Sequence, residues 1–164
     1  MRKTLISVRV YIIADKFGIT QNSVHTIISS YIEYCKALLI KGERVELLGL
    51  VTLVPDVILS KYKTTLAFIC TEIANDLGMP YYTVFSVIRE YLDSLIEEVK
   101  AGTSIEVRGL VAVYPLEQNG VVTKVHSLVS ESIKSLIRSS NTPVTSVRAH
   151  TNKLLKYDIN KAIS

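Results

Sequence analysis

The fold is decided by one stretch that occurs twice in the chain, first as Lys41-Gly42-Glu43-Arg44-Val45-Glu46-Leu47-Leu48-Gly49-Leu50-Val51-Thr52-Leu53. It returns 60 positions later as Ala101-Gly102-Thr103-Ser104-Ile105-Glu106-Val107-Arg108-Gly109-Leu110-Val111-Ala112-Val113. In both copies short apolar runs flank a central glycine. Such runs predict strands, and the glycine predicts a tight bend between them. We therefore expect strands at 44–48 and 51–54, and again at 104–108 and 111–116.

The repeat extends outward from this stretch over most of two units. A shift of 60 residues aligns positions 8–55 with 68–115 without a gap, and 12 of the 48 pairs are identical. Each unit begins with a short apolar helical pattern that ends at a glycine, Gly18 or Gly78. A glycine at this point is typical of a left-handed helix C-terminal cap.

A long amphipathic helix follows in each unit. The patterns cover roughly 20–41 and 80–101, with apolar residues three and four positions apart, and they end at Gly42 and Gly102. We predict that the two long helices pack against each other within the chain.

The C-terminal third departs from the repeat. Asn119-Gly120 is typical of a type I′ hairpin turn, so 121–125 is predicted to be a return strand. Apolar spacing predicts a helix at 127–138, a loop at 139–143 and a second, weaker helix at 145–163.

These patterns predict an α+β fold in three parts. The parts are a first unit at 1–60, a second unit with a short hairpin at 61–126, and a basic, helical extension at 127–164.

Length and composition limit the class of protein. With 164 residues, of which 48% are hydrophobic, the chain can bury a real core. Charges interrupt every apolar run before about 18 residues, and no small-residue cleavage site follows the basic N-terminus. We expect neither a membrane span nor a signal peptide, and a location inside the cell or in a virus particle.

Charge is unevenly distributed along the chain. The net charge of +4 divides into +4 over residues 1–66, −5 over 67–120 and +5 over 121–164. This pattern does not fit a uniformly basic nucleic-acid binder.

Candidate catalytic and metal-binding groups are sparse. Cys35 and Cys70 lie in apolar periodic segments and are expected to be buried hydrophobes. The histidines His25, His126 and His150 have no Cys, Asp or Glu at metal-ligand spacing. No phosphate-binding glycine fingerprint is present. We predict no enzyme activity, no cofactor, no metal and no small-molecule substrate.

The repeat resembles the HU/IHF family of bacterial DNA-architectural proteins. The likeness lies in the glycine-ended helix, the long helix and the turn into two strands. The family's Gly-Phe-Gly-Thr-Phe reads Gly-Leu-Val-Thr-Leu at 49–53 and Gly-Leu-Val-Ala-Val at 109–113.

The resemblance implies a particular architecture and a particular mode of DNA binding. Family members are intertwined dimers, so a tandem copy implies a covalent pseudo-dimer. Each family subunit also has a third strand, a C-terminal helix and a long arm that enters the DNA minor groove. Here the first unit has only 56–65 between its strands and the next helix, and the second unit turns early, at Asn119-Gly120.

Two functions follow from these observations. The first is a structural protein that works through contacts with copies of itself or with virion proteins, as a ring or connector piece of a phage particle by family analogy. The alternative is a histone-like protein that bends duplex DNA. Candidate contacts to DNA phosphates or an acidic partner are Arg44, Arg148, Lys153, Lys156 and Lys161. The residues expected to define the turns are Gly18, Gly42, Gly49, Gly78, Gly102 and Gly109.

Overall fold

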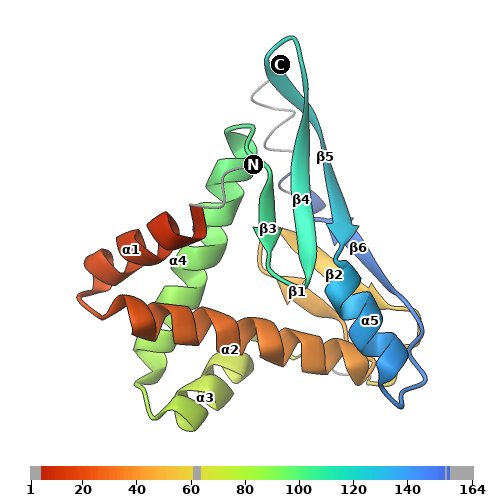
Figure 1. Cartoon of the computed structure of the whole chain (residues 1–164), viewed down its shortest axis with the longest axis horizontal. Helices are drawn as coiled ribbons and strands as arrows, with labels where there is room; N and C mark the ends of the chain where they lie inside the picture. The colour runs from red at the N-terminus through yellow and green to blue at the C-terminus, as the bar shows by residue number, and fades with distance from the viewer. Residues whose placement is uncertain (1–4, 61–63, 154, 156–164) are drawn as a thin grey trace.

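A computed structural model of the chain describes residues 5–60, 64–153 and 155 and has a mixed α+β fold (Figure 1). The helices are α1 (Leu5–Phe17), α2 (Gln21–Ile40), α3 (Leu66–Leu77), α4 (Tyr81–Lys100) and α5 (Glu131–Ser139). The strands are β1 (Val45–Leu47), β2 (Val51–Pro55), β3 (Ile105–Val107), β4 (Val111–Gln118), β5 (Val121–Val129) and β6 (Val147–Thr151).

The predicted repeat is present in the secondary structure. The elements α1, α2, β1 and β2 correspond, 60 residues later, to α3, α4, β3 and β4. The six predicted turn glycines all have positive φ, and within each pair the φ values differ by no more than 11°. Thr20 caps α2 by accepting a hydrogen bond from the Ser23 N–H at 3.0 Å.

The long helices α2 and α4 cross and pack together, as predicted (Figure 1). Tyr31 and Cys35 on α2 and Tyr91 on α4 are buried close to one another, and burial raises the pKa of Tyr91 and of the Cys35 thiol to about 12. The short helices pack across the units. Besides its own long helix, α1 contacts α4 and α3 contacts α2.

Two antiparallel sheets lie against the long helices, and each has three strands in the described part of the chain. The orders are β1-β2-β6 and β3-β4-β5. The inner faces carry buried Val and Leu side chains, such as Leu53 and Val113, which join one continuous core with the helices.

The helix predicted over 145–163 is wrong where it covers β6. Residues 147–151 form a strand that pairs with β2, from Pro55 opposite Val147 to Val51 opposite Thr151. The apolar residues in this segment also fit a helical spacing. In the described residues, however, the edge of β2 that β1 leaves open is paired by this segment, and that pairing requires an extended strand. Residues 145, 146 and 152 are not helical either, whereas Lys153 and Leu155 are; residues 154 and 156–163 of the predicted helix lie outside the described residues.

The hairpin is longer than predicted, and its turn is as expected. The strand β5 continues to Val129, so α5 begins at Glu131 rather than at 127 because Ser130 caps it. Asn119 and Gly120 both have positive φ, 56° and 78°, as a type I′ turn requires. The hairpin extends past the end of β3 as a short arm (Figure 1).

Asp56 joins the end of β2 to the segment that leads into β6. Its carboxylate accepts hydrogen bonds from the N–H groups of Thr145 at 2.9 Å and Ser146 at 3.2 Å, and from the Thr145 hydroxyl. These hydrogen bonds lower the pKa of Asp56 to about 2, and the bond from the Thr145 hydroxyl has the largest effect.

This pKa predicts acid-sensitive docking of β6. An unfolded Asp has a pKa of about 3.9, so the contribution of Asp56 is full above that pH and is lost as pH falls toward about 2. We expect hydrogen-exchange protection of the β6 amides to fall in this window. Asp56→Asn should lower the hydrogen-exchange protection of the β6 amides already at neutral pH. In this variant the protection should show no further fall between about pH 3.9 and about pH 2. Identical pH profiles for the two proteins would show that Asp56 does not secure β6.

Candidate functional site

Two of the predicted cationic contacts, Arg44 and Arg148, lie at the same end of one sheet. Arg44 directly precedes β1 and Arg148 lies on β6, so both are exposed at the same end of the first sheet, where Arg148 is opposite Val54. Lys153 is exposed after the end of β6. Lys156 and Lys161 lie outside the described residues.

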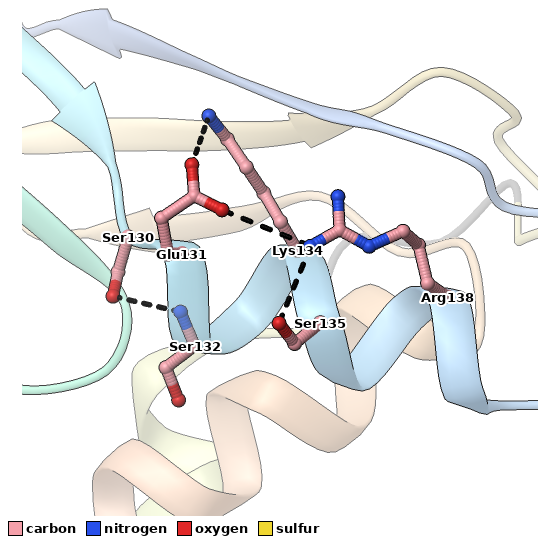
Figure 2. Close-up of polar contacts among 6 residues, drawn as sticks. All are labelled: Ser130, Glu131, Ser132, Lys134, Ser135 and Arg138. Atoms are coloured by element: carbon pink, nitrogen blue, oxygen red, sulfur yellow. Dashed lines mark hydrogen bonds and ion pairs between the residues drawn. The ribbon is translucent and has the colours of Figure 1, made fainter.

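The cations of α5 are balanced by a neighbouring carboxylate. Glu131 makes ion pairs with Lys134 at 3.4 Å and with Arg138 at 3.7 Å, and Arg138 also donates to the Ser135 hydroxyl (Figure 2). Exposed pairs of this kind contribute little to stability, but they reduce the positive charge that α5 presents. The face is therefore a weak candidate for phosphate contacts.

The outer face of the second sheet carries exposed apolar side chains beside the polar Glu106, Lys124 and His126. Leu128 on β5 is 56% exposed and Leu116 on β4 is 42% exposed. The Tyr114 ring lies on the same face and stacks on His126 with ring centroids 5.9 Å apart. We call Leu116, Tyr114 and Leu128 the sheet patch.

A hollow of about 250 Å³ lies beside the sheet patch. Leu128 and Ala112 form part of its lining, and Glu106, Glu131 and Lys134 supply charged groups around it. The lining carries two carboxylates and one ammonium group, so the hollow combines an apolar surface with a small net negative charge, which fits an apolar, basic segment of another molecule.

A second apolar surface lies on the outside of α1. Val8, Tyr11 and Ile12 are about half exposed, at 49%, 58% and 55%. Their spacing of three and four residues places them on one side of the helix. We call these three residues the α1 patch.

The internal repeat provides a comparison for both patches. Tyr11 and Ile12 correspond to Thr71 and Glu72 on α3. By strand register, Leu128 corresponds to His150, and by the repeat Leu116 corresponds to Asp56. Each patch is therefore apolar in one unit and more polar in the other, so the shared fold does not require it to be apolar.

Sequence reasoning missed both patches. The α1 patch could have been found by comparing outward-facing residues between the units. The sheet patch depends on the register of β5, which was predicted to end four residues earlier.

The described residues contain no group of side chains suited to metal binding. They contain no cluster of three or more His, Cys, Asp or Glu that could hold a metal. Cys35 and Cys70 are buried, as predicted, and burial raises the pKa of the Cys70 thiol to about 11. Both thiols are therefore poor nucleophiles at neutral pH.

None of the helices in the described ranges has the length and apolar character needed to cross a membrane. No family model, curated protein or solved structure matches the chain.

Proposed function

We propose that the chain is a non-enzymatic structural protein, a covalent pseudo-dimer of two HU/IHF-like units that assembles with copies of itself. The observation that carries the proposal is the presence of two unlike exposed apolar surfaces, the α1 patch and the sheet patch. Each has a more polar counterpart in the other unit.

Reciprocal contacts between the units support the pseudo-dimer. A Cβ placed on Gly49 would lie 2.9 Å from Cδ1 of Ile96, which is on α4 of the other unit. A Cβ placed on Gly109 would lie 2.6 Å from Nζ of Lys36, which is on α2. Ile96 and Lys36 are equivalent by the 60-residue shift. The two units thus exchange the same contact, as the subunits of a two-fold dimer do.

The third strands support the same arrangement. Thr151 pairs with Val51 as Val129 pairs with Val111. The next residue donates to the equivalent carbonyl in each sheet, Asn152 to Leu50 at 2.9 Å and Ser130 to Leu110 at 2.8 Å. The C-terminal segment gives the first unit the third strand that the family resemblance implies.

Two different surfaces on one chain favour head-to-tail association. A contact between unlike surfaces builds a ring when the rotation closes and an open chain when it does not. The hollow by the sheet patch is lined by Glu106 and Glu131 against Lys134, a net charge of −1, whereas the sequence before the α1 patch includes Arg2 and Lys3. We propose that the α1 patch of one copy docks on the sheet patch of the next, as in a ring piece of a phage particle.

Sedimentation velocity over a range of concentrations tests this proposal with variants taken from the repeat itself. Tyr11→Thr with Ile12→Glu gives α1 the residues of α3, and Leu128→His gives β5 the residue of β6. Each variant should weaken association by about 2 to 3 kcal/mol, or roughly 30- to 140-fold in Kd. Because each retains one patch, an equal mixture should form a dimer and stop there.

The matched control is Thr71→Ala on α3, which should assemble like the natural chain. A natural chain that stays monomeric at every concentration would contradict the proposal.

The alternative, DNA binding, rests on exposed Arg148, which has no ion pair among the described residues. It would be favoured by a Kd for duplex DNA below about 1 μM at physiological salt, with a steep salt dependence that Arg148→Ala reduces.

A further inference from the structure

A cavity of about 240 Å³ opens between α1, α2, α4 and the turn after β3. This volume has room for about eight water molecules at roughly 30 Å³ each. Ile28, Ile32 and the Tyr91 ring form part of its wall. The charged and polar residues that line it are Arg9, His25, Glu33, Lys36 and Arg108.

Three cations from three separate parts of the fold line this cavity. Arg9 on α1 is buried, with its side chain 9% exposed, and it makes an ion pair with Glu98 on α4. Lys36 on α2 is 15% exposed and pairs with Glu33 at 3.2 Å, but the Glu33 side chain is 71% exposed. A pair with so exposed a partner is weak. Arg108 is exposed and has no ion pair within the described residues.

Four of the positions that line the cavity correspond, by the 60-residue shift, to apolar side chains. Lys36 corresponds to Ile96, Arg108 to Leu48 and His25 to Phe85. Ile96, Leu48 and Phe85 are all partly buried and pack against the core. Arg9 corresponds to Ile69, which is buried.

This comparison shows whether the fold itself requires charged or polar residues at these positions. The fold accepts apolar residues at all four equivalent positions, which are Ile69, Phe85 and Ile96 in the second unit and Leu48 in the first. Around the cavity stand instead Arg9, His25 and Lys36 of the first unit and Arg108 of the second. Burying a guanidinium and leaving a cavity both cost stability, and neither is required by the architecture.

We propose that this cavity binds a small organic molecule that carries a phosphate group. A phosphate has three strong acceptor oxygens and a charge near −2 at neutral pH, which three converging cationic donors match. Arg108 and Lys36 hold the phosphate at the mouth of the cavity, and buried Arg9 supplies positive charge from within. Ile28, Ile32 and Tyr91 contact the organic part.

Burial lowers the pKa of Arg9, because the surrounding protein desolvates its guanidinium. An incoming anion would restore part of the charge stabilisation that Arg9 loses in this position.

Calorimetric titration with phenyl phosphate tests the proposal in about 0.15 M salt. We expect the natural chain to bind with a Kd of about 1 mM or lower. Lys36→Ile and Arg108→Leu should each weaken binding at least tenfold. Both variants use residues that already pack at the equivalent positions, Ile96 and Leu48, and thermal unfolding without ligand will confirm that each folds.

Arg148→Ala is the matched control, because it removes an exposed arginine outside the cavity and should leave the Kd unchanged. Phenol, which lacks the phosphate, should not bind. Absence of phenyl phosphate binding by the natural chain would overturn the proposal. The proposal would also be overturned if Lys36→Ile and Arg108→Leu bound phenyl phosphate as tightly as the natural chain does. It would be overturned, too, if the two substitutions weakened binding only of duplex DNA.

Discussion

A chain truncated after Pro143 is expected to lose its cooperative fold. The removed segment contains β6, the third strand of the first sheet, and buried Val144, Val147 and Leu155. Burial of each such side chain contributes about 1.5 to 3 kcal/mol, so the three together contribute about 5 to 9 kcal/mol. Since a whole domain is stable by only about 5 to 15 kcal/mol, the loss removes from about a third to all of that stability.

Far-UV circular dichroism during thermal unfolding measures this result. We expect a broad transition or precipitation, because β2 is left with an unpaired edge. A synthetic peptide of residues 144–164 should restore a cooperative transition by adding the missing strand. The control peptide carries Val147→Asp, which puts a charge on the buried face of β6. An unchanged midpoint in the truncated chain would mean that β6 is not part of the cooperative unit.

Gly49→Ala is expected to cost about 2 to 5 kcal/mol of unfolding free energy, from two sources. Gly49 has a φ of +80°, where a side chain costs about 1 to 2 kcal/mol. The new methyl would also lie 2.9 Å from Cδ1 of Ile96, and overpacking of this kind costs about 1 to 3 kcal/mol.

Urea unfolding separates the two contributions. Gly18 has a φ of +64° and nothing within 4 Å of its missing Cβ, so Gly18→Ala should show only the backbone cost of about 1 to 2 kcal/mol. Ile96→Val removes the atom in conflict. In that background Gly49→Ala should cost about as much as Gly18→Ala. If Ile96→Val gives no relief, the cross-unit contact at Gly49 is not as described.

The repeated part of the fold could be predicted from the sequence because its signals are local. Glycine positions, helical periodicity and the Asn119-Gly120 turn all act within a few residues. The strand β6 could not be found in this way. Its partner is about 90 positions earlier in the chain, and its apolar residues also fit a helical spacing.

The candidate site was less accessible to sequence reasoning. Arg9, Lys36 and Arg108 are far apart in the sequence and converge only when α1 and the turn after β3 meet the long helices. A usable signal was nevertheless present. Each of the three basic residues stands where the equivalent position of the other unit has isoleucine or leucine, and only the repeat makes these differences visible.

The position of β6 also sets the order in which the molecule can be completed during synthesis. The first sheet receives its third strand from residues made about 90 positions after β2. At about 5 to 20 residues per second, the ribosome needs roughly 5 to 18 seconds to make that length. The second sheet has all its strands by Val129, so it can close before the first. The half that begins first therefore finishes last, and the nascent chain carries an open sheet edge for most of its synthesis.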